Sequence, residues 1–285
     1  MPIKKIIEYK SIQSFISAPV FVVGCGRSGT TALVKSLSQH PQVHFGLSEA
    51  AIIDEHIGNV AYHYECSDIA DYYHNTTHIH SDSLKNTLRT ICFESVFGEK
   101  YGLEVILRQF MGRIKKLLPL RYWGAKAFPP EDQAKGLVWL FPEVKFLYIY
   151  RNGLDVVHSM TRTDFAERMN FEALCRFWAD RILQYKYLTN WDKAQSVRFN
   201  DFLGKPQEVL QEIMQFLELD YHPAPYDFAT TTMVGPLGKS DKKTDPKEEM
   251  RKRAPGYASW THDQKSIFKN VCQGAMEESG YEIPF

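Results

Sequence analysis

The sequence has 285 residues and no net formal charge, because 34 basic side chains balance 34 acidic ones. Apolar residues make up 44% and charged residues 24%, which is typical of a globular chain rather than a disordered one. This balance provides no global field for nucleic acid or for an anionic membrane, so we expect neither as a partner. Any anion site has to be built locally.

No stretch has the ~20 apolar residues that a membrane span needs, and residues 1–17 lack the apolar core of a signal peptide. The five cysteines are widely spread and form no C-x-x-C pair. This pattern favours a reduced, cytoplasmic protein without structural zinc.

Short apolar runs alternate with helical patterns along the chain. The first run, residues 19–23, is β-branched and ends at Gly24, which predicts a buried parallel strand. Further elements are predicted in chain order: a helix over 30–39, a polar cap of helices and loops over 44–104, a strand over 122–128, a helix over 131–141, a strand over 145–150, helices over 153–163 and 171–190, a strand over 196–199, an amphipathic helix from Pro206 to Leu217, a mobile loop over 235–256 and a last helix over 261–278. The alternation predicts a single α/β domain over 1–285, with helices on both faces of a parallel sheet.

A glycine-rich segment lies between the first strand and the first helix, where backbone N–H groups and a helix N-terminus converge on a phosphate. Its spacing is similar to the P-loop pattern G-x-x-x-x-G-K-[ST], but Thr30 stands in the lysine position and the nearest cation is Arg27. With helices on both faces of the sheet, the fold is expected to have three layers and to be P-loop-like. The candidate anion-binding residues are Cys25, Gly26, Arg27, Ser28, Gly29, Thr30 and Thr31.

A second signal follows the buried strand 145–150. That strand ends in Arg151, where a nucleoside triphosphatase uses an aspartate to help hold Mg²⁺. Ser159 follows about two helical turns later, so Arg151 and Ser159 are placed to converge on one phosphate. The pattern predicts an anion held by protein cations without a metal. The histidine pair His78-x-His80 lacks a third ligand at the usual spacing, and we predict no metal site there.

Four segments, in this order, resemble the sulfotransferase family. They are FVVGCGRSGTTALVKSLSQHPQV (21–43), FPEVKFLYIYRNGLDVVHSM (141–160), SVRFNDFLGKPQEVLQEIMQFLEL (196–219), and the run Arg251 to Gly256 followed by Trp260. The resemblance implies that 3′-phosphoadenosine 5′-phosphosulfate (PAPS) is the co-substrate, with its 5′-phosphosulfate on the first loop and its 3′-phosphate on Arg151 and Ser159. It further implies that Phe199 faces the adenine and that a basic lid covers the phosphates, formed by Arg251, Lys252 and Arg253.

The resemblance also suggests the catalytic residues. In the cytosolic branch of the family the base is a histidine two residues after a strand lysine; here the lysine position is Lys126 and the histidine position is Phe128. In the branch that includes tyrosylprotein and many bacterial enzymes, a glutamate shortly after the first helix is the base, which points to Glu49, with His44 in reserve. Lys126 and Arg27 are expected to stabilise charge on the sulfuryl group.

The acceptor is suggested by the charge of the cap. Residues 44–104 contain ten acidic side chains against three basic ones, a net charge of about −7. This disfavours a polyanion and favours a small, neutral or cationic acceptor such as an amino or guanidino natural product. Two rival functions remain, a P-loop kinase that needs ATP and Mg²⁺ and a non-catalytic nucleotide-binding protein. The oligomeric state is left open, with a homodimer as one alternative.

Overall fold

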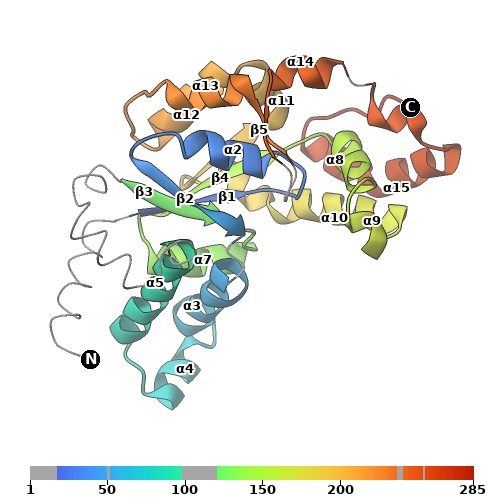
Figure 1. Ribbon diagram of the computed structural model, residues 1–285. Helices are drawn as coiled ribbons and strands as arrows, with labels where there is room; N and C mark the ends of the chain where they lie inside the picture. Colours follow the sequence, from blue (N-terminus) through green and yellow to red (C-terminus); the bar gives the residue numbers. More distant parts are fainter. Residues whose placement is uncertain (1–17, 50–51, 98–120, 236–239, 253) are drawn as a thin grey trace. The chain divides into compact units, whose positions relative to one another are not determined.

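The computed structural model describes residues 18–49, 52–97, 121–235, 240–252 and 254–285. Its centre is a five-stranded sheet in the order β2-β3-β1-β4-β5, flanked by helices (Figure 1). The strands are β1 (Ala18–Val23), β2 (Val43–Glu49), β3 (Tyr122–Lys126), β4 (Lys145–Tyr150) and β5 (Ala194–Arg198). β3 runs parallel to both of its neighbours, β1 and β2. The predicted α/β class with a parallel sheet is therefore confirmed.

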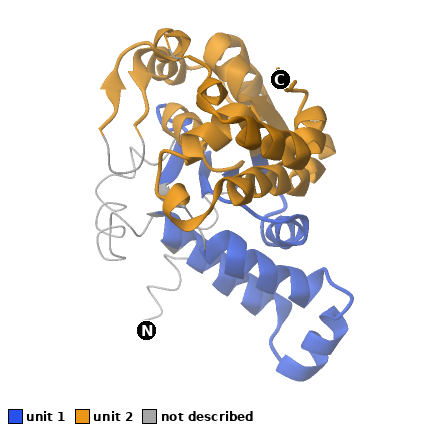
Figure 2. Ribbon diagram, turned by 90° about the vertical axis from the view of Figure 1, so that its right-hand side faces the viewer, with its two compact units in different colours: residues 1–22, 37–146 blue, residues 23–36, 147–285 orange. Residues whose placement is uncertain are grey.

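The chain divides into two compact units, each built from two stretches of sequence (Figure 2). Unit 1 comprises residues 1–22 and 37–146, and unit 2 comprises residues 23–36 and 147–285. The helices of unit 1 are the π-helix η1 (Ile52–Ile57), α3 (Gly58–Glu65), α4 (Ala70–Thr77), α5 (Ser81–Phe97) and α7 (Glu131–Leu140). Those of unit 2 are α2 (Thr30–Leu37), α8 (Gly153–Met160), α9 (Phe165–Arg168), α10 (Phe171–Gln184), the 3-10 turn η2 (Lys186–Asn190), α11 (Phe199–Gly204), α12 (Pro206–Phe216), α13 (Ala224–Thr231), α14 (Pro246–Arg251), the 3-10 turn η3 (Gly256–Ser259) and α15 (His262–Glu278). Strands β6 (Thr232–Met233) and β7 (Lys242–Lys243) form a small antiparallel ribbon.

In unit 1, helices α3 and α7 touch through their backbones. A Cβ added at Gly136 would lie 2.2 Å from the carbonyl oxygen of Gly58, and one added at Gly58 would lie 2.9 Å from that of Gln133. Only glycine fits at such an approach. The two glycines therefore fix the segment around η1 and α3 against α7.

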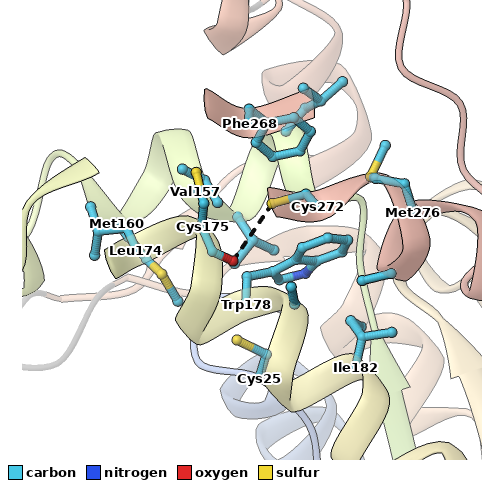
Figure 3. Close-up of a cluster of buried hydrophobic side chains, with 14 of the residues drawn as sticks. Cys25, Val157, Met160, Leu174, Cys175, Trp178, Ile182, Phe268, Cys272 and Met276 are labelled. Atoms are coloured by element: carbon cyan, nitrogen blue, oxygen red, sulfur yellow. Dashed lines mark hydrogen bonds between the residues drawn. The ribbon is translucent and has the colours of Figure 1, made fainter. Parts of the chain in front are cut away.

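In unit 2, helices α10 and α15 enclose an apolar cluster (Figure 3). Its centre is the pair Trp178 and Phe268, whose rings stack with centroids 6.3 Å apart. The Cys272 thiol donates to the carbonyl oxygen of Cys175 at 3.6 Å, and Cys25, from the loop after β1, belongs to the same cluster. The glycine-rich loop is thus anchored in the core by one of its own side chains.

The structure corrects the sequence prediction at three places. Residues 44–49 of the expected cap of helices and loops belong instead to strand β2. In this strand Val43 and Phe45 are buried on either side of half-buried His44. The expected mobile loop contains helix α14, since the Asp245 side chain caps the amides of its first turn. Phe199 begins α11 rather than ending a strand. Residues 50–51 and 98–104 of the expected cap and residues 236–239 and 253 of the expected loop lie outside the described residues.

Among the helices that the structure describes, none has both the length and the apolar character that a membrane crossing requires.

Candidate active site

The loop between β1 and α2 has the backbone form of an anion site. A Cβ at Gly24 would lie 2.2 Å from the carbonyl oxygen of Ile149, so glycine is needed where the loop passes β4. Arg27 and Gly29 have positive φ angles of 71° and 100°. Such alternation turns the N–H groups of a loop toward one side, as in the nests that bind phosphate. Helix α2 begins directly afterwards at Thr30.

The side chains of this loop have separate roles. Ser28 is fully buried, and its Oγ has no hydrogen-bond partner among the described residues. Burial raises the pKa of the Cys25 thiol to about 12, so the thiol stays protonated at neutral pH. Because Cys25 points into the core cluster (Figure 3), only its backbone is left for a ligand. Its burial makes Cys25 a small, inert residue of the loop rather than a reactive thiol.

The structure brings Arg27, Arg151 and Ser159 together within unit 2. Arg27 Nε donates to Ser159 Oγ at 3.1 Å, and Arg151 Nη1 donates to the carbonyl oxygen of Arg27 at 3.4 Å. The pKa of Arg27 is lowered, first by burial and then by the positive charge of Arg151, while Asp164 partly offsets both. Two partly buried guanidinium groups that repel each other form a site that an anion would stabilise.

Arg151 lies between an acid and an aromatic ring. Its Nη2 pairs with Asp155 Oδ2 at 3.2 Å, and its guanidinium carbon lies 4.5 Å from the centroid of the Phe199 ring. Its Nε has no hydrogen-bond partner among the described residues, although the side chain is only 12% exposed. The edge of Phe199 would lie 2.4 Å from a Cβ at Gly29, so the ring packs on the loop itself. The role of Phe199 toward adenine stays a prediction.

Arg251 and Lys252, the described basic residues of the expected lid, make their ion pairs away from this cluster. Arg251 and Lys252 are exposed and pair with Glu248 at 3.1 Å and Glu249 at 3.3 Å, within or just after helix α14. Arg253 lies outside the described residues. The end of the same segment nevertheless reaches the site, since a Cβ at Gly256 would collide with the ring of His158, the neighbour of Ser159.

Unit 1 contains the other candidate catalytic residues, on two neighbouring strands. Glu49 is the last residue of β2 and Lys126 the last of β3, and the two are partners in the parallel register, after an irregularity between Phe45 and Glu49. Lys126 is buried. His44 is the partner of Trp123, three residues before Lys126, or about 10 Å along the strand. The register thus places Glu49, rather than His44, beside Lys126.

The sequence prediction missed Asp54, a buried acid in the π-helix η1. Its carboxylate accepts the backbone N–H groups of Phe128 and Glu55. Burial raises its pKa from 3.8 to about 6, although these hydrogen bonds act in the opposite direction. In the sequence Asp54 is marked only by its place directly after the apolar pair Ile52-Ile53, and this signal is too weak to single out the residue.

Comparison with known proteins agrees with this geometry. Residues 19–223, more than half of the chain, match the sulfotransferase family. The chain therefore belongs to the sulfotransferase family, which is a family of enzymes. Among curated proteins, none is similar enough to this sequence to count as a match.

Solved structures show the same fold at low identity. The sulfotransferase domain from the curacin biosynthetic pathway is 16% identical with a TM-score of 0.51, over 94% of this chain and 99% of that one. The sulfotransferase domain of the Synechococcus PCC 7002 olefin synthase is 17% identical with a TM-score of 0.52, over 94% and 96%. Mouse sulfotransferase SULT7A1, solved in complex with 3′,5′-bisphosphoadenosine (PAP), is 15% identical with a TM-score of 0.50, over 95% and 88%.

Proposed function

We propose that this protein transfers a sulfuryl group from PAPS to a hydroxyl or amino group of a small acceptor. The observation that carries the proposal is the cluster of Arg27, Arg151 and Ser159 around a glycine loop whose lysine position is occupied by Thr30. An anion site built from two arginines and a hydroxyl has no need of Mg²⁺ to neutralise its ligand. That a mouse relative in fold was solved with PAP supports the same donor.

The residues of the cluster fit such a donor. Two buried polar atoms of the site, Ser28 Oγ and Arg151 Nε, have no partner among the described residues, and buried polar groups are rarely left unpaired. A phosphate or sulfate oxygen would satisfy both. We assign the 5′-phosphosulfate to the loop 25–31 and the 3′-phosphate to Arg151 and Ser159. Phe199 is assigned to the adenine, and Arg251, Lys252 and Arg253 to a lid that closes over the phosphates.

The proposed chemistry is an in-line displacement at sulfur. Glu49 accepts the proton of the acceptor as its oxygen or nitrogen forms a bond to sulfur, and the bond from sulfur to the phosphate oxygen breaks to release PAP. Lys126 and Arg27 stabilise the charge that develops on the sulfuryl and bridging oxygens. The register of β2 with β3 supports Glu49 over the reserve base His44. With Glu49 as the base, we assign the protein to the glutamate-base branch of the family.

The acceptor class is proposed from charge. The stretch 44–104 has ten acidic side chains against three basic ones, a surplus that would repel a polyanion. A neutral or cationic small molecule suits it better, and a natural product with an amino group is a fitting first choice.

Calorimetry followed by an acceptor screen tests the proposal. Wild-type protein is titrated with PAP, with ATP and with ATP–Mg²⁺, and is then assayed for sulfuryl transfer from PAPS to amines, guanidines, alcohols and phenols. We expect metal-independent binding of PAP. We also expect Glu49→Gln to bind PAP normally while losing turnover, and the exposed Glu55→Gln to behave as wild type. Binding of ATP–Mg²⁺ alone would favour a kinase, and PAP binding with no effect of Glu49→Gln would contradict the assigned base.

A further inference from the structure

The chain just beyond Lys126 has few backbone donors. The Ala127 N–H donates to the carbonyl oxygen of Val22 at 3.2 Å and so extends the pairing of β3 with β1. The next residue, Phe128, is followed by Pro129 and Pro130, which have no N–H group. The Phe128 N–H is therefore the last backbone donor before helix α7. It donates to the carboxylate of Asp54.

Both carboxylate oxygens of Asp54 accept hydrogen bonds from backbone N–H groups. Oδ2 accepts from Phe128, and Oδ1 accepts from the N–H of Glu55 at 2.9 Å. The residue is only 3% exposed and lies between buried Ile53 and Ile57 in η1. Burying a carboxylate costs free energy unless hydrogen bonds compensate. A π-helical turn is rare and is frequently found at functional sites.

The element that carries Asp54 is itself held in place. Helix α3 follows η1 without a break and contacts α7 at the glycine pair Gly58 and Gly136. Pro129 and Pro130 lead directly into α7. The short segment from Lys126 to Pro130 is thus bounded by the sheet at one end and by the α3–α7 contact at the other. Asp54 accepts the N–H of Phe128, which lies between these two fixed points.

We propose that Asp54 is a positioning residue for sulfuryl transfer, which fixes the end of β3 so that Lys126 keeps its register with Glu49. The inference rests on the proposed function, because it gives Lys126 a task in the transfer. Loss of Asp54 removes this hydrogen bond to the backbone two residues from Lys126. A displacement of about 1 Å at a catalytic group can cost about 100-fold in rate.

Two substitutions and one matched control separate this role from a general effect on folding. Asp54→Ala removes both acceptors, whereas Asp54→Asn keeps one oxygen for the Phe128 N–H and loses the charge. Glu55→Gln removes the same charge one residue away, from an exposed side chain. Assays run well below each variant's melting temperature, so that all three are compared as folded proteins.

Three readouts are taken on each folded variant: the rate at which acetic anhydride modifies Lys126, followed by mass spectrometry; kcat and KM for an acceptor found in the screen; and the dissociation constant for PAP. We expect Lys126 to be protected in wild type and in Glu55→Gln, and to react at least fivefold faster in Asp54→Ala. Turnover should fall about 100-fold in Asp54→Ala and about tenfold in Asp54→Asn. PAP affinity should stay within twofold of wild type, because the donor residues belong to unit 2.

The outcomes distinguish the two proposals. Unchanged Lys126 reactivity in both Asp54 variants, or unchanged kcat despite a lowered melting temperature, would overturn the positioning role and leave the proposed function intact. A wild-type protein that binds PAP but transfers no sulfuryl group would overturn the proposed function, and with it the role of Asp54 in transfer. If Asp54→Ala does not fold, the intermediate loss of turnover and gain of Lys126 reactivity in Asp54→Asn decides the matter alone.

Discussion

Replacing Arg151 by alanine is the sharpest test of the donor site. The side chain is only 12% exposed, and its guanidinium contacts the carbonyl oxygen of Arg27, the carboxylate of Asp155 and the ring of Phe199. A hydrogen bond to a charged group contributes about 1.5–3 kcal/mol. At about 1.4 kcal/mol for each factor of ten, the loss of Arg151 should weaken PAP binding by about 10- to 100-fold. The Asp155 side chain is 39% exposed, so water can solvate its carboxylate once Arg151 is removed, and the fold should persist.

The assay is calorimetric titration with PAP in the absence of divalent metal. Arg176→Ala is the matched control, because Arg176 also pairs with an acid of its own helix, Glu172, but is 64% exposed. Arg151→Lys keeps the charge and loses the planar fork of donors, so it should recover only part of the affinity. We expect Arg176→Ala to bind as wild type does. The melting temperature of each variant, measured without ligand, shows whether an affinity change reflects the site.

Two results would refute this reasoning. The first is an Arg151→Ala protein that binds PAP as tightly as wild type. The second is an equal loss of affinity in Arg151→Ala and Arg176→Ala, which would mean that net charge, and not the cluster around the loop, governs binding. Either result would contradict the assignment of the 3′-phosphate to Arg151.

Three further predictions follow from the same geometry. Gly29→Ala should lower the free energy of unfolding by about 1–3 kcal/mol and abolish PAP binding, because φ is 100° and a Cβ would collide with the ring of Phe199. The control Gly274→Ala, on an open face of helix α15, should instead raise the free energy of unfolding by about 0.5–1 kcal/mol. Asp54 has a folded pKa of about 6 against 3.8 unfolded, so its contribution to stability is present below pH 4 and is lost as the pH rises through 6. Denaturant titrations of wild type and Asp54→Asn should differ in this pH dependence by about 3 kcal/mol, and parallel curves would contradict it. In folded protein a thiol reagent should modify Cys66 first and leave Cys25 unmodified, as peptide mapping would show, because only Cys66 is exposed.

Local sequence determined most of the elements on which the site is built. The runs 19–23 and 145–150 formed buried strands, because β-branched and aromatic residues without polar interruption suit a strand covered on both faces. The apolar stripe of α12 and the start of α15 were equally local: Thr261 and Gln264 form a reciprocal cap within one turn. The glycine loop was evident too, since its backbone conformation needs glycine at set positions.

Other elements could not be predicted from the sequence, because their local signals are too short to outweigh the surrounding residues. Strand β2 has only a few residues of alternating burial, within a polar stretch that suggested a cap. Helix α14 is a single capped helical stretch inside a segment rich in glycine, proline and lysine. Such segments take the structure that their neighbours permit, because their own propensity differs little between the alternatives.

Tertiary structure alone decided which side chains meet. Arg27 and Ser159 are 132 residues apart, and Asp54 and Phe128 are 74 apart, yet each pair is joined by a hydrogen bond. The choice of Glu49 over His44 as the neighbour of Lys126 likewise depends on the register of β2 with β3. The residue types of a site can be read from sequence, because chemistry restricts them. Their pairing depends on strand order and register, which arise from packing of the whole chain and leave no local pattern.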